Sequence, residues 1–139
     1  TVSNEPALIQ KLTEIKNENK LVNGYIFFLY QPRHDAYYKR LVATDILYVK
    51  DNAYFRAMPL NAQKYLNYAL IEKEYVLLEV SDVKARDYVE TYGADYVFVY
   101  NVYVRETIGE VIFTFDVKPS QEQIDLLVKR LRSIKYFVI

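Results

Sequence analysis

Residues 96–104 read Tyr-Val-Phe-Val-Tyr-Asn-Val-Tyr-Val, a run that predicts a β-strand. Residues at even positions would form one face of this strand and residues at odd positions the other, and both sets are largely apolar. Strands that are apolar on both faces are typical of sheets that are covered on both sides. We therefore predict that residues 96–104 form a strand that is central in a sheet or covered on both faces.

Helices and strands are predicted on both sides of this strand. The first helix covers residues 5–19, with Asn4 as its N-cap and Leu8, Leu12 and Ile15 on one face. The order of elements predicts an α/β protein (α+β) of two small lobes, residues 1–81 and 82–139. Further helices are predicted over residues 35–42, 59–73 and 82–92 and after Ser120. In the last of these helices, the apolar stripe consists of Ile124, Leu127, Val128 and Leu131. Further strands are predicted over residues 25–30, 45–49, 53–58, 75–80, 111–117 and 136–139, and a turn over residues 106–109.

The residue types that are missing limit the chemistry of the chain. Its 139 residues include one histidine and no cysteine, which excludes disulfides, cysteine nucleophiles and two-histidine metal sites. Lys plus Arg and Asp plus Glu each number 18, and this zero net charge argues against a general nucleic-acid coat. No apolar run reaches the length of a membrane span. We expect a cytoplasmic, intracellular protein without metal, cofactor or membrane contact.

The charges are unevenly distributed along the chain. The segment from residue 72 to residue 95 contains seven acidic and three basic residues, whereas the segment after residue 117 contains five basic and two acidic residues. Both segments are either solvated helix faces, or an acidic surface for a basic partner and a basic strip for a phosphate backbone.

Few side chains form a recognisable catalytic pattern. His34 lies in a polar stretch and has no serine or cysteine partner nearby in sequence, so we interpret it as a surface residue. A metal-dependent nuclease would require Asp45, Glu79 and Lys84 to converge, although the Glu-x-Lys pattern of such enzymes is missing here. The last four residues, Tyr136, Phe137, Val138 and Ile139, form an apolar segment that is either a core strand or an edge offered to a partner.

Several segments resemble the archaeal tRNA-splicing endonuclease family. Residues 59–80 are similar to the helix and strand that close the family's N-terminal lobe. The segment Tyr92-Gly93-Ala94-Asp95-Tyr96 resembles the family's Phe/Tyr-Gly-Ala-Asp-Phe segment, and Val99-Tyr100 resembles the end of the strand that follows. Residues 130–135, Arg-Leu-Arg-Ser-Ile-Lys, and the apolar residues after them are similar to the family's last helix, its lysine and its final strand.

The resemblance implies a fold and a role. The C-terminal lobe would be restriction-endonuclease-like, with a central mixed sheet flanked by helices. The family cleaves RNA without metal through a tyrosine, a histidine and a lysine; Tyr100 and Lys135 would occupy two of these positions, and no histidine follows Tyr100. Because the histidine supplies acid–base catalysis, its absence implies a structural, non-catalytic subunit of a tRNA-splicing endonuclease, inactive alone.

This role implies partners. The subunit would join a catalytic endonuclease subunit in a hetero-oligomer, or self-associate, and would help to position precursor tRNA. Lys129, Arg130 and Arg132 would contact the RNA, and Tyr136 to Ile139 would form the interface. Two alternatives stay open: a stand-alone protein-interaction domain without catalysis, of viral or thermophilic origin, and the divergent metal-dependent nuclease described above.

Overall fold

The computed structural model describes residues 2–33, 36–47, 57–59, 73–105 and 107–138 of the chain. Its centre is a six-stranded sheet with the strand order β3-β2-β1-β6-β5-β4. Every pair of neighbouring strands is antiparallel. The strands are β1 (Val22–Arg33), β2 (Ala36–Thr44), β3 (Ala57–Pro59), β4 (Tyr75–Glu79), β5 (Tyr96–Val104) and β6 (Thr107–Phe115).

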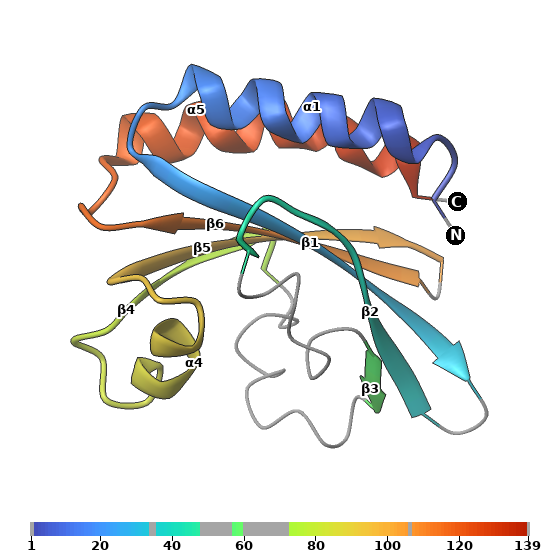
Figure 1. Cartoon of the computed structure of the whole chain (residues 1–139), viewed down its shortest axis with the longest axis horizontal. Helices are drawn as coiled ribbons and strands as arrows, with labels where there is room; N and C mark the ends of the chain where they lie inside the picture. Colours follow the sequence, from blue (N-terminus) through green and yellow to red (C-terminus); the bar gives the residue numbers. More distant parts are fainter. Residues whose placement is uncertain (1, 34–35, 48–56, 60–72, 106, 139) are drawn as a thin grey trace.

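Helices cover both faces of this sheet (Figure 1). Helices α1 and α5 lie side by side on one face, and the short helix α4 lies on the opposite face. Among the described residues, none of the helices combines the length and the apolar character that a membrane span needs. The helices are α1 (Glu5–Glu18), α4 (Arg86–Thr91), α5 (Gln121–Leu131) and the 3-10 helix η3 (Arg132–Phe137).

The sequence explains where α1 and α5 begin and which side they bury. The side-chain oxygen of Asn4 caps α1 by accepting a hydrogen bond from the backbone N–H of Ala7 at 3.2 Å. Ser120 caps α5 in a capping box, in which Ser120 and Gln123 each accept a hydrogen bond from the other's backbone N–H. The predicted apolar stripes are confirmed as the buried residues Leu8, Leu12 and Ile15 of α1 and Ile124, Leu127, Val128 and Leu131 of α5.

Strands β5 and β6 are covered on both faces, which confirms the prediction for residues 96–104. On the side of α1 and α5, the rings of Phe98 and Phe113 stack with their centroids 6.5 Å apart. On the side of α4, Val99 and Ile112 are fully buried opposite one another. Burying an apolar side chain of this size contributes roughly 1.5–3 kcal/mol, so burial on two faces holds this strand pair firmly at the centre.

Residues 35–42, predicted as a short helix, lie mostly in strand β2. This strand pairs with β1 in antiparallel register, with Lys39 opposite Tyr30 and Ala43 opposite Phe27. A register shift between Phe27 and Phe28 marks a bulge in β1. The helix prediction is wrong because the backbone groups of β1 form hydrogen bonds with this segment, and the local sequence contains no information about that distant partner.

The predicted strand over residues 136–139 is also wrong. The chain leaves α5 directly into η3, and the segment after it makes only an isolated bridge between Val138 and Val2. The backbone N–H of Ser3 donates to the carbonyl of Phe137 at 2.9 Å, so the two ends of the described chain meet (Figure 1).

The sheet is antiparallel rather than mixed, which corrects part of the predicted fold class. Strands β1 and β2, and likewise β5 and β6, follow one another directly, and short connections of this kind impose antiparallel pairing. Strands β1 and β6 pair with each other, which joins residues from both sides of the predicted boundary at residue 81 in one sheet. The strand predicted over residues 45–49 is wrong for its described part, because β2 ends at Thr44 and residues 45–47 are not in a strand. Residues 48–49, residues 53–56 of the next predicted strand and residues 60–72 of the predicted helix over residues 59–73 lie outside the described residues.

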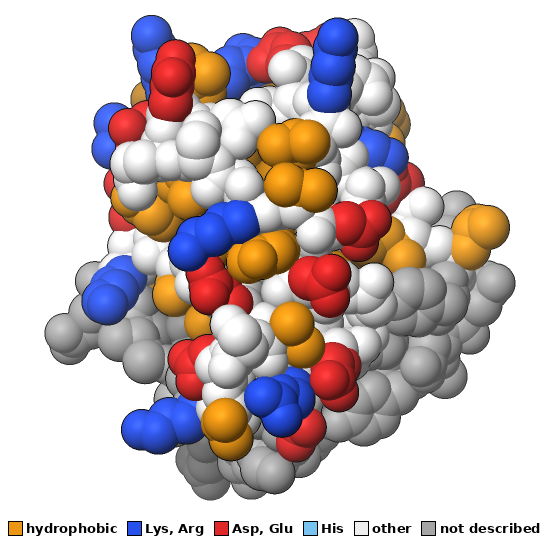
Figure 2. All heavy atoms as spheres, turned by 90° about the vertical axis from the view of Figure 1, so that its left-hand side faces the viewer, with side chains coloured by type: hydrophobic (Ala, Val, Ile, Leu, Met, Phe, Trp, Pro, Cys, Tyr) orange, Lys and Arg blue, Asp and Glu red, His pale blue; other side chains and the backbone are white. Residues whose placement is uncertain are grey.

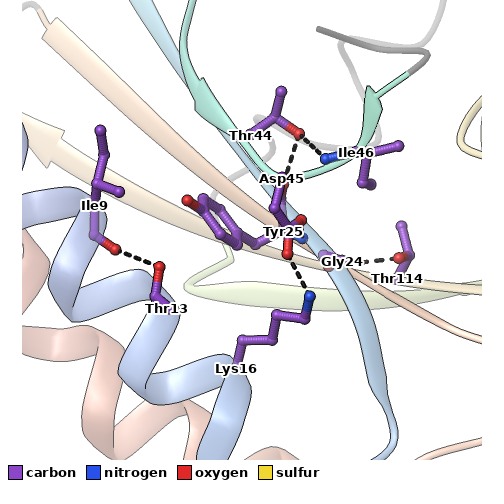
Figure 3. Close-up of polar contacts among 9 residues, drawn as sticks. All are labelled: Ile9, Thr13, Lys16, Gly24, Tyr25, Thr44, Asp45, Ile46 and Thr114. Atoms are coloured by element: carbon purple, nitrogen blue, oxygen red, sulfur yellow. Dashed lines mark hydrogen bonds and ion pairs between the residues drawn. The ribbon is translucent and has the colours of Figure 1, made fainter.

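The corner after β2 is tied to β1 and α1 through Asp45 (Figure 3). The carboxylate of Asp45 accepts a hydrogen bond from the backbone N–H of Tyr25 at 2.8 Å and pairs with the ammonium of Lys16 in α1. The hydroxyl of Thr44 donates to the carbonyl of Tyr25 at 2.8 Å. These contacts fix the end of β2 against the helix layer.

Gly24→Ala is expected to lower the free energy of unfolding by about 1–3 kcal/mol through overpacking, as urea denaturation would measure. A Cβ at Gly24 would lie 2.5 Å from Cγ1 of Ile46 and 3.2 Å from Oδ1 of Asp45. Ile46→Ala removes the clashing atoms, so the double variant should lose less stability than the sum of the two single variants. Strictly additive losses would contradict this account of the corner.

Candidate functional site

A buried polar cluster lies on the α4 face of the sheet. It consists of Tyr30 on β1, Lys39 on β2, Asn101 on β5 and Glu110 on β6, which are at most 6% exposed. Side chains two residues apart on a strand share a face, so Glu110 lies on the same side as Ile112, in the apolar cluster that α4 covers. A carboxylate in such surroundings needs polar partners.

The strand register explains how these four side chains meet. Asn101 is directly opposite Glu110, and Tyr30 is directly opposite Lys39. The hydroxyl of Tyr30 donates to Oε1 of Glu110 at 3.3 Å. The ammonium of Lys39 lies 3.9 Å from the centroid of the Phe28 ring, close enough for a cation–π interaction.

Two acceptor atoms of the cluster have no hydrogen-bond partner among the described residues. They are Oε2 of Glu110 and Oδ1 of Asn101. The amide nitrogen of Asn101 is used, since it donates to the carbonyl of Lys73 at 3.3 Å. Opposed residues on neighbouring antiparallel strands have Cβ atoms about 5 Å apart, so the two acceptors come from adjacent positions on one face. Buried acceptors of this kind are rare in folded proteins and are costly unless a donor satisfies them.

Burial shifts the ionisation of the cluster. It raises the pKa of Glu110 to about 7, against the opposing effects of Lys39 and of the Tyr30 hydrogen bond. It also lowers the pKa of Lys39, an effect that the charge of Glu110 partly offsets. The pKa values of Tyr30 and Tyr88 are raised well above the ordinary range, first by burial and then by Glu110. Near neutral pH, Glu110 therefore exchanges between its charged and neutral forms.

Helix α4 contributes aromatic rings to the same side of the sheet. The rings of Tyr88 and Tyr92 meet edge to face, with centroids 5.1 Å apart, and both residues belong to the cluster that covers Ile26 and Phe28. The site thus has an apolar, aromatic surround and a small set of polar atoms, which is the usual composition of a small-molecule site.

The sequence pattern does not single out Lys39 or Glu110. It predicts a helix over residues 35–42 and a turn over residues 106–109, which leaves both residues off any sheet face. A signal is nevertheless present, because Glu110 falls in period-two alternation with Ile112 and Thr114. A lone carboxylate on an apolar strand face indicates a buried polar site.

The structure brings Tyr100 and Lys135, the two predicted catalytic remnants, into one groove of about 490 Å³. The hydroxyl of Tyr100 donates to Glu74 at 2.9 Å, and the guanidinium of Arg132 holds the same carboxylate through two hydrogen bonds of 3.0 and 3.1 Å. The Arg132 hydrogen bonds are the main cause of a lowered Glu74 pKa, whereas burial and the Glu74 hydrogen bond raise the pKa of Tyr100. We name this hollow, at the edge of β5, the β5-edge groove.

Two of the three predicted RNA-binding residues take part in ion pairs. Arg130 makes a two-pronged ion pair with Glu18 of α1, with both distances 2.9 Å, and Arg132 is held by Glu74. Lys129 is exposed on α5. Figure 2 shows that acidic, basic and apolar side chains are interspersed over the described part of the end of the molecule where α4 and β4 lie.

The residues required by a metal-dependent nuclease are separated. Asp45 follows β2 and Glu79 ends β4, so three strands of the sheet stand between them, and each already has a lysine partner, Lys16 and Lys118 respectively. No cluster of three or more potential metal ligands occurs among the described residues. The convergence of Asp45, Glu79 and Lys84 is therefore wrong, because sequence order does not reveal which edge of the sheet a strand occupies.

The predicted C-terminal interface is divided between surface and core. Tyr136 is 71% exposed, whereas Val138 is fully buried and Phe137 packs against the core beneath α1 and α5. Ile139 and the candidate base His34 lie outside the described residues.

No model of a protein family and no curated protein sequence matches the chain. Solved structures do match it. A domain assigned to a two-component sensor histidine kinase of Sinorhizobium meliloti superposes with a TM-score of 0.68 at 15% identity, over 98% of this chain and 91% of that one. The GAF domain/HD domain protein from Geobacter sulfurreducens superposes with a TM-score of 0.66 at 16% identity, over 99% of this chain and 94% of that one. The phycocyanobilin-bound GAF domain of a cyanobacterial phytochrome superposes with a TM-score of 0.57 at 11% identity, over 98% of this chain and 96% of that one.

The chain has a GAF-like fold. This finding corrects the predicted family, because these neighbours are sensory domains and not subunits of a tRNA-splicing endonuclease. The restriction-endonuclease-like fold and the role as a structural splicing subunit are therefore wrong. The RNA contacts of Lys129, Arg130 and Arg132 stay a prediction. The segments that suggested the family combine an amphipathic helix with an apolar strand, a pattern that many unrelated folds share.

Stability should fall as the pH rises through the titration of Glu110. With its pKa raised from 4.5 to about 7, the folded state keeps a proton that the unfolded state has lost. Stability is therefore full below about pH 4.5 and declines until about pH 7, by about 3 kcal/mol. Urea denaturation at pH 5 and pH 8 measures most of this difference, which Glu110→Gln should abolish.

His34→Gln is the control for this pH dependence, since His34 is the sole histidine and histidine is the side-chain type whose ordinary pKa lies in this pH range. This variant should keep the decline between pH 5 and pH 8. A decline that survives in Glu110→Gln and disappears in His34→Gln would assign the titration to the histidine instead.

Proposed function

We propose that this chain is a non-catalytic sensory domain that binds a small molecule on the α4 face of its sheet. The observation that carries this proposal is the pair of neighbouring buried acceptors, Oε2 of Glu110 and Oδ1 of Asn101, which lack a donor among the described residues. A ligand that supplies an N–H or O–H group would satisfy them and recover the cost of their burial.

The fold supports the same proposal. One structural neighbour is a GAF domain that holds phycocyanobilin, and another is assigned to a sensor histidine kinase. A non-catalytic interaction domain, one of the alternatives predicted from the sequence, agrees better with such neighbours than a splicing subunit does.

The surroundings of the acceptors define the chemistry of the ligand. Apolar residues dominate this face, where Phe28 and Val99 are fully buried near the polar cluster. Tyr88 of α4 and Tyr92, directly after the helix, add aromatic rings. A charged ligand would lose its hydration here, and Lys39 already supplies one positive charge close to Glu110. We infer a neutral, largely apolar and preferably aromatic ligand that carries one hydrogen-bond donor.

Protein-observed NMR with a fragment library tests this function, with indole and N-methylindole as a matched pair that differs in one N–H donor. Donor-bearing aromatic fragments should shift the amide signals of α4, β5 and β6, and indole should bind more tightly than N-methylindole. At pH 8, where Glu110 is mostly charged, Glu110→Gln should weaken donor-bearing fragments by about tenfold, the range expected for a hydrogen bond to a charged group.

Glu122→Gln, the same substitution at an exposed position of α5, is the control and should leave fragment binding unchanged. The proposal is wrong if the library gives no fragment that binds on the α4 face, or if the fragments that bind there are indifferent to Glu110→Gln.

A further inference from the structure

We propose that the β5-edge groove is a second binding site, which takes a small organic anion, a phosphate or carboxylate, between the ammonium groups of Lys73 and Lys135. The two residues come from distant parts of the chain, one just before β4 and the other from η3 after the last α-helix. This proposal does not depend on a ligand at the α4 face.

The groove exists because β5 is longer than β4. The pairing of the two strands ends where Tyr75 lies opposite Tyr100, followed by one further hydrogen bond of 2.9 Å from the N–H of Asn101 to the carbonyl of Glu74. Beyond this point β5 continues alone among the described strands on that side, and η3 passes nearby with Arg132 and Lys135. The resulting hollow of about 490 Å³ lies within the roughly 300–1,000 Å³ that small-molecule sites occupy.

Among the described residues that line the groove, Glu74 is the only carboxylate, and its hydrogen bonds are already made. Glu74 accepts two hydrogen bonds from Arg132 and one from the hydroxyl of Tyr100. A two-pronged pair of this kind fixes both side chains and neutralises their charges. Glu74 therefore neither repels an incoming anion strongly nor serves as the partner of the lysines.

The lysines remain available for a ligand. Within the described residues, neither Lys73 nor Lys135 has an ion-pair partner. Lys135 lies 5.3 Å from the ring centroid of Tyr136, a weak contact that leaves its charge uncompensated. With the pair of Glu74 and Arg132 neutral, the described residues of the lining carry two net positive charges. Two positive charges balance a phosphate dianion and exceed the single charge of a carboxylate by one.

The floor of the groove indicates that the anion has an apolar body. Val102 is almost fully buried there, and the ring of Tyr103 is 49% exposed beside it. An aromatic ring on the ligand would cover this apolar surface, so an aryl phosphate should bind more tightly than inorganic phosphate.

Titration of the full chain with inorganic phosphate, phenyl phosphate and benzoate, followed by amide NMR at pH 7 and low salt, tests the site. We expect saturable shifts at residues 73–74, 100–103 and 132–135, with phenyl phosphate tighter than inorganic phosphate. The double variant Lys73→Gln/Lys135→Gln should weaken phenyl phosphate by at least about tenfold, since two charge-assisted contacts are lost. A preference for phenyl phosphate over benzoate would assign a phosphate ligand, and the reverse a carboxylate.

The charge-matched control Lys20→Gln/Lys84→Gln removes two exposed lysines outside the groove and should bind as the wild type does. Lys73→Arg/Lys135→Arg keeps both charges and should retain binding. Indole, which carries no negative charge, should not produce these shifts, which separates this site from the one on the α4 face. The absence of saturable shifts in the groove with all three anions, or equal weakening in the control and in the groove variant, would overturn the proposal.

Discussion

The rest of the structure depends on the burial of β6 on both faces. This strand lies between β1 and β5, and its residues from Gly109 to Phe115 are all buried. A strand that is hidden on both faces requires one layer of cover on each side, and α1 with α5 provides one layer while α4 contributes to the other. The antiparallel pairing of β1 with β6 also brings together residues 80 positions apart in sequence, such as Tyr30 and Glu110.

The two faces of the sheet differ in character. The face under α1 and α5 is packed with aliphatic and aromatic side chains such as Leu12, Phe113 and Leu131, which suits a rigid support. The α4 face carries the buried polar cluster and a short helix, of which Tyr88 and Val89 are buried. Polar atoms within an apolar layer select a ligand by the position of its hydrogen-bonding groups, so the α4 face is the one that could distinguish one ligand from another.

At the edge of the sheet beside β5, ion pairs and hydrogen bonds hold the elements together. Here Glu74 links the start of β4 to η3 through Arg132 and to β5 through Tyr100. This three-way contact occupies Glu74, so that Lys73 and Lys135 beside it have no carboxylate partner within the described parts of the chain. The chain as a whole is neutral, yet the pairing of specific residues produces a local positive hollow that net charge does not reveal.

The sequence by itself determined the features that depend on local interactions. The bounds of β5, the caps of α1 and α5 and their buried stripes all follow from period and capping chemistry within a few residues. Only the tertiary structure decided that residues 36–44 form a strand, that the C-terminal segment is a 3-10 helix, and that Lys39, Asn101 and Glu110 share one buried site. The physical reason is that strand pairing and the burial of a charge depend on partners far away in the chain, and no local pattern specifies which partners those are.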